Sequence, residues 1–291
     1  MAKTAGGKKR TKPTRRGSSW GAMLLALFVG IALIVVVAIS LLRSHGPGGS
    51  SGQRSSTIGQ KVPRGIVQDL ASIPTTVFNR IGTPSVLSPT AVPKEPITGK
   101  VPVLYVGAEF CPYCAAGRWS MIVALSRFGS FSGLEYMRSA GSPEVYPNTP
   151  TFTFLHAHYQ SPYVDFQTVE VQTRDHAPLQ QMSAQQQALM QQFDAPPYVP
   201  AEAQGAIPFL LVGHRYLFLG GPYPPALLDG KSWQSIASSL TKGSGPAASA
   251  IIANANELTA SICALDGGKP TNVCGTPVIR NAIKVLPVSV P

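Results

Sequence analysis

The longest run of hydrophobic residues lies near the start of the chain. Residues 20–42 contain no charged side chain, and a helix of this length can span a bilayer with some tilt. A soluble helix of the same length would need a polar face. A cleavable signal peptide would be shorter and would end in a small-residue site, for which residues 38–40 are a poor match. The pattern therefore predicts one uncleaved transmembrane signal anchor over residues 20–42.

Beyond this run, shorter apolar segments alternate with polar and turn-forming residues, which is typical of an α/β domain. Consecutive apolar residues at 103–106 predict a buried strand, and helical spacing predicts a helix over 115–128. A turn around Ser161 and Pro162 is expected to join two of the later strands. The remaining predicted elements are strands at 134–138, 149–158 and 164–173, a hairpin of 208–212 with 216–219, and helices at 178–193, 233–240 and 247–265.

Two segments of biased composition separate the predicted anchor from the predicted strand at 103–106. Residues 43–60 are rich in glycine and serine and predict a flexible linker. Residues 61–100 are rich in proline and predict an arm on the surface of the domain. Within this arm, residues 66–73 favour a short helix and residues 75–81 favour a strand or extended segment.

The positive charge of the chain is concentrated in its first residues. The formal net charge is +11, and residues 1–19 contain lysines and arginines but no acidic residue. Because most of the excess positive charge belongs to this tail, we infer no general nucleic-acid surface and expect no nucleic-acid partner. Only Arg43 directly follows the apolar run, so the positive-inside rule places the tail in the cytoplasm. We expect a single-pass protein of the cell membrane whose domain is extracytoplasmic.

Two cysteines separated by two residues follow the predicted strand and open the predicted helix. Cys111-Pro112-Tyr113-Cys114 in this context is typical of a redox motif. A helix that begins at Cys114 would present its N-terminal N–H groups to Cys111 and stabilise a thiolate there. Pro112 fits the first turn, where its missing N–H costs nothing. We therefore expect Cys111 to be an exposed nucleophile and Cys114 a buried resolving thiol, joined as a disulfide in the oxidised state.

The segment GAEFCPYC, residues 107–114, resembles the thioredoxin superfamily, whose members carry a small residue, an acid and an aromatic residue before the motif. The longer runs YVGAEFCPYCAAGRWSMIVALSRFG and VYPNTPTFTF resemble a membrane-anchored thioredoxin-like family catalogued only as domain-of-unknown-function family 929. This closer resemblance covers residues 97–278. It implies redox chemistry and supplies no substrate.

The resemblance also implies an architecture for residues 101–291: an α/β thioredoxin-like fold with a central mixed sheet flanked by helices. The superfamily needs a cis-proline facing the cysteines at the start of a later buried strand, and GAIPFLLV makes Pro208 the candidate. The distance along the chain from the motif to Pro208 exceeds that of a minimal thioredoxin. We therefore expect an inserted helical and hairpin segment at about residues 140–200, followed by a C-terminal helix and a second cysteine pair at 247–280.

Side chains around the motif bear on how it exchanges protons and contacts other proteins. Glu109 stands two residues before Cys111, as an acid does in many thioredoxins, and is either a proton-transfer residue or a solvated loop acid. Reducing thioredoxins carry a buried acid where this chain has Tyr105, which puts efficient reductase chemistry in doubt. The Pro-Tyr dipeptide is that of glutaredoxins, so the direction of exchange stays open. Phe110 and Tyr113 are candidates for apolar contact with a client polypeptide.

The chain contains four cysteines, and the second pair is Cys263 and Cys274. Spaced cysteines in exported chains usually form structural bridges, and we expect this pair to form one. Its alternative role is a second redox pair that passes electrons to or from the first. A zinc site that combines the first pair with His156 and His158 is a further alternative, although an all-cysteine zinc site would need a second close pair.

These observations together predict a membrane-anchored thiol–disulfide oxidoreductase that acts outside the cytoplasm. Its expected partners are exported proteins that contain cysteines, a membrane protein that resets the redox state of the motif, and the lipid bilayer. We expect no cofactor and no metal. The alternative from another class is a non-catalytic scaffold, in which a thioredoxin-like fold with a permanent disulfide organises a membrane complex.

Overall fold

The computed structural model describes the residues 57–85, 88–93, 96–288 and 290. The predicted cytoplasmic tail, the predicted anchor at 20–42 and the linker up to residue 56 lie outside the described residues. Among the residues that are described, no helix has both the length and the hydrophobicity needed to cross a bilayer.

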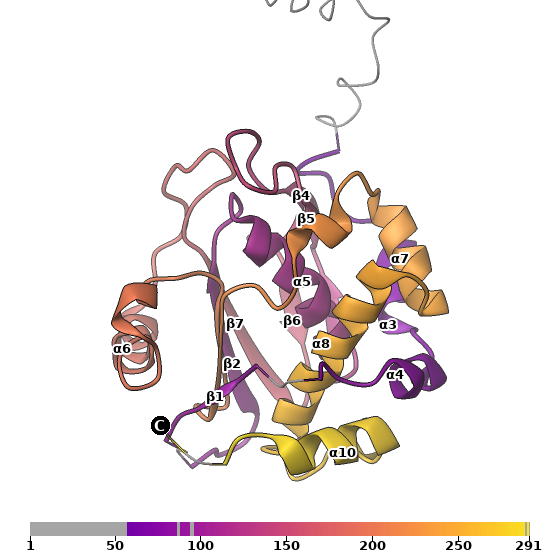
Figure 1. Cartoon of the computed structure of the whole chain (residues 1–291), viewed down its shortest axis with the longest axis vertical. Helices are drawn as coiled ribbons and strands as arrows, with labels where there is room; N and C mark the ends of the chain where they lie inside the picture. Colours follow the sequence, from indigo (N-terminus) through magenta and orange to yellow (C-terminus); the bar gives the residue numbers. More distant parts are fainter. Residues whose placement is uncertain (1–56, 86–87, 94–95, 289, 291) are drawn as a thin grey trace, which may run out of the picture. The chain divides into compact units, whose positions relative to one another are not determined.

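The described chain contains both strands and helices, with the strands β3 to β7 in succession in its middle and helices alone at its C-terminal end (Figure 1). The strands are β1 (Thr90–Ala91), β2 (Val101–Gly107), β3 (Ser130–Ser132), β4 (Glu135–Arg138), β5 (Pro150–Thr153), β6 (His158–Gln160), β7 (Val164–Glu170), β8 (Phe209–Val212) and β9 (Tyr216–Leu219). The α-helices are α3 (Arg64–Ala71), α4 (Thr75–Ile81), α5 (Pro112–Leu125), α6 (Ala184–Phe193), α7 (Trp233–Lys242), α8 (Pro246–Cys263), α9 (Thr271–Cys274) and α10 (Pro277–Val285). Two short 3-10 helices are η1 (Ala201–Ala203) and η2 (Pro225–Leu228).

A mixed five-stranded sheet in the order β1-β9-β8-β2-β7 forms the centre of the fold. β2 runs parallel to β7, with Val103 opposite Phe166, and antiparallel to β8, with Val106 opposite Phe209. β8 and β9 form the predicted hairpin, and the turn uses Gly213 in the left-handed region, which favours glycine. The predicted α/β class with a central mixed sheet flanked by helices is therefore confirmed.

Both faces of the sheet are covered at its central strand β2, which explains why β2 is an unbroken apolar run. Successive side chains of a strand point to opposite faces, and Val103 and Tyr105 belong to one core cluster while Leu104 and Val106 belong to another. The first cluster includes α5 and α8, and the second includes Phe193 at the end of α6. Figure 1 shows α5 and α8 on one side of β2 and β7, with α6 on the other side.

α5 is the central helix of the larger core and carries the cysteine motif at its N-terminus. All of its residues except Tyr113 are buried, and a helix that is buried on every side needs apolar residues all round. It packs against α8, which begins with a proline in its first turn, a position that proline favours. The helix that presents the motif is thus anchored along its whole length.

The proline-rich arm differs from the prediction in two ways. Residues 75–81 form helix α4 and not a strand, and the helix predicted at 66–73 lies at Arg64–Ala71. The arm also contributes to the core and does not only cover it, because Ile66, Leu70 and Phe78 are buried in the main cluster. The β-branched residues of α4 favour a strand locally, and burial of its apolar face against α8 and α10 overrides that preference.

The turn predicted around Ser161 and Pro162 does join two strands, β6 and β7, but these two strands do not pair with each other, and the strand predicted at 149–158 is divided into β5 and β6. β5 pairs with β4 and β6 pairs with β3 in two small antiparallel sheets, while β7 joins the main sheet beside β2. Alternating hydrophobicity located the strands, but it carries no information about which distant strand each one pairs with.

The inserted segment contains the predicted helix in a shorter form. α6 begins at Ala184, where Ser183 and Gln186 form a capping box, and not at residue 178. Before it, Leu179 and Gln180 donate backbone hydrogen bonds to Val171 and Glu170 and so continue as extended chain beside the end of β7. No prediction was made for α10 or for the edge strand β1, which the arm supplies.

Candidate active site

The cysteine motif lies where β2 ends and α5 begins. Cys111 is the N-cap residue of α5, in extended conformation, and its Sγ accepts a hydrogen bond from the backbone N–H of Cys114 at 3.2 Å. Pro112 occupies the first turn, so the helix begins two residues earlier than predicted. The sulfur of Cys111 therefore takes the place that a serine or aspartate oxygen usually fills at a helix N-terminus, where partial positive charge favours an anion.

Both cysteines of the motif are free thiols in the structure. Cys114 is fully buried, as expected, and Cys111 is only 4% exposed. The expectation of an exposed Cys111 is therefore wrong, although Cys111 is the more accessible of the two. The pKa of Cys111 is lowered, chiefly by its hydrogen bond with the Cys114 side chain and also by the Cys114 backbone N–H and the charge of Arg118. Burial raises the pKa of the Cys114 thiol well above its ordinary value. The pair thus favours a thiolate on Cys111 beside a protonated Cys114.

Pro208 lies at the start of β8, directly across from the motif. The Ile207–Pro208 peptide bond is cis, and the Sγ of Cys111 lies 3.8 Å from the backbone oxygen of Ile207. The pairing of Phe209 with Val106 fixes this position, because it aligns the beginning of β8 with the end of β2. The residues that the resemblance linked to the site, Cys111, Cys114 and Pro208, are therefore brought together.

Aromatic side chains from three separate segments surround the motif. Tyr113 is 39% exposed and meets the edge of Tyr146 at 5.8 Å between ring centroids. Phe110 packs against the ring of His176 at 4.2 Å between centroids. Tyr146 and His176 both come from loops in or beside the expected insertion, and Ala140 donates a backbone hydrogen bond to the Phe110 carbonyl. The insertion therefore shapes the surface around Cys111, which the sequence did not indicate.

The region that holds this site matches a known protein family. The family described as Domain of unknown function (DUF929) matches residues 91–264. The chain belongs to this family. The match includes the whole main sheet apart from Thr90, and it contains Cys111, Cys114 and Pro208, whereas Cys274 lies beyond it. No curated protein and no solved structure matches the chain.

A buried ion pair lies behind the cysteines of the DUF929 domain. Arg118 follows Cys114 by one helical turn, and its side chain and that of Glu170 are both fully buried. Its Nε donates to Oε1 of Glu170 at 3.0 Å and its Nη2 donates to Oε2 at 2.6 Å and to the Ala108 carbonyl at 2.8 Å. Burial alone would lower the pKa of Arg118, but the Glu170 carboxylate raises it and keeps the guanidinium charged.

This ion pair was not predicted from the sequence, although the position of Arg118 gave a signal that it needs a partner. Arg118 is the one charged residue in an otherwise apolar helix, and a charge in that setting is rarely buried without a partner. Its partner, Glu170, stands at the end of β7, 52 residues away, and only the parallel pairing of β7 with β2 brings the two together.

Tyr105, which stands where reducing thioredoxins carry a buried acid, is fully buried beneath the motif. The Cζ of Arg118 lies 5.8 Å from its ring centroid, and the ring of Phe154 meets it edge-on. Within the described residues, its hydroxyl has no hydrogen-bond partner, and neither has Nη1 of Arg118. Burial raises the pKa of Tyr105 well above its ordinary value, so the hydroxyl is a proton donor and not a base.

Glu109 is buried and not the solvated loop acid that was one of its two interpretations. Its Oε1 accepts a hydrogen bond from the Thr153 hydroxyl at 2.7 Å, and its backbone N–H donates to the Gln172 carbonyl. Burial raises the pKa of Glu109, while the bond from Thr153 opposes that effect. Its carboxyl therefore faces β5, and within the described chain no hydrogen bond links it to either thiol.

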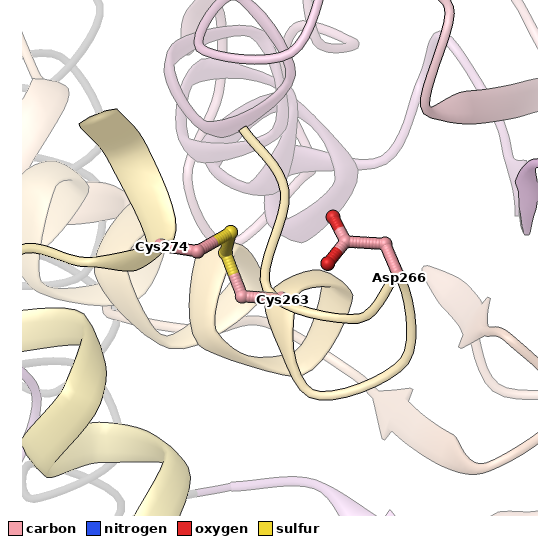
Figure 2. A group of neighbouring side chains, drawn as sticks. All are labelled: Cys263, Asp266 and Cys274. Atoms are coloured by element: carbon pink, nitrogen blue, oxygen red, sulfur yellow. A yellow bond between two sulfur atoms is a disulfide. The ribbon is translucent and has the colours of Figure 1, made fainter. Parts of the chain in front are cut away.

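The predicted disulfide between Cys263 and Cys274 is present, with the two Cα atoms 5.5 Å apart. It joins the end of α8 to the end of α9, and Asp266 lies on the loop between them with its carboxylate turned toward the sulfurs (Figure 2). The sulfur and carboxylate atoms of these three residues lie within 4.8 Å of one another. Because the sulfurs are bonded to each other, however, neither is a thiolate able to bind a metal.

The zinc alternative at the first pair does not fit the geometry. His156 contacts Glu135, with 3.2 Å between Nδ1 and Oε1, and its side chain is 63% exposed. His158 lies on β6, which pairs with β3 and not with the main sheet. Among the described residues, the ligand-forming side chains that cluster closely enough for a metal are those at the second pair.

Proposed function

We propose that this protein is a membrane-anchored thiol–disulfide oxidoreductase of thioredoxin-like fold, which acts outside the cytoplasm on cysteines of exported proteins. The observation that carries the proposal is the environment of the Cys111 sulfur. It caps α5, accepts a hydrogen bond from the Cys114 N–H, and faces the Ile207 carbonyl beside Pro208. The helix N-terminus and the Cys114 N–H favour a thiolate at this position, which is the reactive form in disulfide exchange, whereas the Ile207 carbonyl accepts a hydrogen bond only from the protonated thiol.

The order of the strands supports the thioredoxin-like assignment. β7, β2, β8 and β9 are adjacent, the first two are parallel, and the last two form an antiparallel hairpin. α5 connects out of β2, and α8 packs on the same face of the sheet. This is the arrangement that the superfamily resemblance implies around a strand, a cysteine motif and a helix.

In the oxidising direction, a client thiolate attacks the Sγ of Cys111 in the Cys111–Cys114 disulfide. The bond between the two sulfurs breaks, and its electron pair leaves on Cys114 while a mixed disulfide forms between the client and Cys111. A second client thiolate then attacks the client sulfur of this mixed disulfide and expels Cys111 as a thiolate. The client loses two electrons and the motif gains them.

The reducing direction runs these steps in reverse. Cys111 attacks a client disulfide and Cys114, after losing its proton, attacks Cys111 and releases the reduced client. In both directions Pro208 holds the client backbone beside Cys111. Glu109, whose pKa burial raises, holds a proton near the motif, but its carboxyl bonds to Thr153 and, in the described structure, to neither thiol.

Localisation in the membrane is part of the proposal. The apolar run at 20–42 and the basic tail before it support an anchor with a cytoplasmic N-terminus. A motif that oxidises or reduces many clients must be reset after each turnover, so a redox-active membrane protein is the partner that this function requires.

Trapping of clients tests the proposal. We would express the full-length protein with Cys114→Ser in its membrane, so that a mixed disulfide at Cys111 cannot be resolved, and separate the adducts under non-reducing conditions. The expected result is a set of disulfide-linked complexes that disappear with a reductant and in the matched variant with both Cys111→Ser and Cys114→Ser. Equal adducts in the matched variant, or none in either variant, would contradict it.

One observation favours the alternative scaffold function. Cys111 is only 4% exposed, and the aromatic side chains around it are packed against loops of the insertion. If the protein is a scaffold, the aromatic surface around Tyr113 binds a membrane partner, and the cysteines form no disulfide with that partner. Adducts absent from the trapping experiment, combined with co-purification of a partner that Tyr113→Ala releases, would support the scaffold.

A further inference from the structure

We propose that Arg118 is a positioning residue that stabilises negative charge on the sulfur of Cys114 and thereby directs exchange toward oxidation of clients. The inference rests on the proposed exchange function and adds its preferred direction. It follows from the polar groups that are buried behind the motif and from the kind of group that is absent there among the described residues.

The guanidinium of Arg118 is held close to the motif by three contacts. Two of them reach Glu170, and the third, from Nη2, reaches the carbonyl of Ala108. Ala108 packs in one small cluster with Cys111 and Cys114. Because Arg118 lies one turn after Cys114 on α5, its stem leaves the same face of the helix as the Cys114 side chain. The guanidinium is therefore held beside the small cluster that contains both cysteines, and while burial raises the pKa of the Cys114 thiol, the Arg118 charge opposes that rise.

Two proton donors in this region have no partner in the described structure. One is Nη1 of Arg118 and the other is the hydroxyl of Tyr105. The Tyr105 hydroxyl lies under Gly107, since a Cβ at that glycine would overlap it, and so it points toward the end of β2 from which the motif emerges. A buried donor without an acceptor is unfavourable. A thiolate in this region would supply the acceptor.

A base for Cys114 is missing from the same region of the described chain. The Glu170 carboxylate is engaged by Arg118 through both oxygens, and the Glu109 carboxyl bonds to Thr153. Tyr105 replaces the acid of reducing thioredoxins. The polar groups near the motif that remain without an acceptor are consequently donors, one of them on a cation, and such groups suit a departing thiolate better than a thiol that must give up its proton.

The excess of donors over bases near the motif matters because the two directions of exchange require opposite changes at Cys114. In client oxidation, Cys114 is the leaving group and carries away the electron pair of the broken disulfide as a thiolate. In client reduction, Cys114 starts as a buried thiol and must lose a proton before it attacks. A neighbouring cation lowers the energy of the departing thiolate and of the reduced motif, which makes the Cys111–Cys114 disulfide a stronger oxidant.

Glu170 provides an internal control of opposite sign. It neutralises part of the Arg118 charge, so its removal should strengthen the effect of Arg118 on the sulfurs. Loss of Arg118 alone would leave Glu170 as an unpaired buried charge and threaten the fold. The informative variants are therefore Arg118→Met combined with Glu170→Met, which removes both charges, Glu170→Gln, which removes one, and Arg118→Lys, which keeps the positive charge.

The test is the exchange equilibrium between glutathione and the full-length protein in detergent. After acid quenching, differential alkylation and peptide mass spectrometry report Cys111 and Cys114 separately from Cys263 and Cys274, which serve as a control in the same tube. We expect the double variant to shift the equilibrium about tenfold toward the disulfide, a fall of about 30 mV in potential. Glu170→Gln should shift it the other way, and Arg118→Lys should stay near the parent protein.

Equal equilibria in the parent, the double variant and Glu170→Gln would overturn the inference. If the double variant does not fold, Glu170→Gln decides alone: a shift of the equilibrium toward the dithiol supports the inference, and no shift or a shift toward the disulfide overturns it. These results are distinct from failure of the proposed function. In that case Cys111 and Cys114 of the parent protein itself would not equilibrate with glutathione.

Discussion

The two cysteine pairs of this chain lie at opposite ends of the same strand and have opposite chemistry. Cys111 and Cys114 follow the end of β2 as free thiols. The disulfide of Cys263 and Cys274 lies near the start of β2, because Leu265 packs against Gly213, which donates a hydrogen bond to the Pro102 carbonyl. A strand of this length separates the pairs by about 20 Å.

The surroundings of the two cysteine pairs differ as much as their bonding state. The first pair is held at a helix N-terminus, above a buried guanidinium and opposite a proline. The second pair closes a short loop between two helices, beside an aspartate that bonds to backbone N–H groups. A direct relay of electrons between pairs this far apart has no support in the geometry. The second pair fits a structural bridge, and substitutions at the two pairs should therefore have different effects.

The largest contrast is expected from removal of the attacking sulfur. Cys111→Ser should abolish exchange with a model disulfide, because the serine hydroxyl is not a nucleophile in this reaction. Serine is a good N-cap residue and can accept the hydrogen bond from the Cys114 N–H, so α5 should be retained. The measurements are the exchange rate and the circular dichroism spectrum. Residual exchange at the parent rate would assign the activity to another cysteine.

At the second pair, substitution is expected to lower stability and to leave exchange intact. Replacing both Cys263 and Cys274 by serine should lower the free energy of unfolding by about 3 kcal/mol, the loop-closure value for a short loop, and leave exchange at Cys111 unchanged. Denaturant titration and the same exchange assay measure the two effects. A large loss of exchange in a variant that is still folded would instead give the second pair a redox role.

A smaller effect is expected in the response to pH. Because the pKa of Cys111 is lowered and that of Cys114 is raised, iodoacetamide should modify Cys111 in the reduced protein below the ordinary thiol pKa of about 8.5, and Cys114 only above it. The Cys111 thiolate should stabilise the reduced fold above that ordinary value, and this contribution should fade as pH falls through the lowered pKa. Mass spectrometry at a series of pH values checks the order, which equal reactivity would contradict.

The smallest effect is expected at Glu109. Glu109→Gln keeps an acceptor for the Thr153 hydroxyl, and because no hydrogen bond links this carboxyl to the thiols in the described structure, exchange should slow by less than about tenfold. The raised pKa of Glu109 means that its favourable contribution is full at low pH and is lost as pH rises through that pKa. The variant should therefore gain stability over the parent as pH rises. A gain at low pH would contradict this explanation.

The sequence predicted the parts of the site that are close together along the chain. The apolar run before Cys111, the cysteine spacing and the helix after it are local features, and the structure places them as expected apart from the two ends of α5, which lie earlier in the chain than predicted. Pro208 is far from Cys111 in sequence, and it was found through the family resemblance. The burial of Cys111 was not predicted, because it depends on how Phe110 and Tyr113 pack against the insertion.

The missed features all depend on contacts between distant segments. The Arg118–Glu170 pair forms only because β7 lies parallel to β2. α4 is a helix because Phe78 is buried in the core, although its β-branched neighbours favour a strand. The separate pairing of the strands on either side of Ser161 was not predicted for the same reason, since strand alternation does not specify the pairing partner.

The most direct test of the account is the reduction potential of each cysteine pair in the full-length protein. Titration against glutathione buffers, with site-resolved alkylation, gives both values from one sample. The account predicts that Cys111 and Cys114 equilibrate within the glutathione range while Cys263 and Cys274 stay oxidised below about −300 mV, as structural bridges do. If Cys111 and Cys114 resist reduction as strongly as the second pair, the proposed exchange function is contradicted.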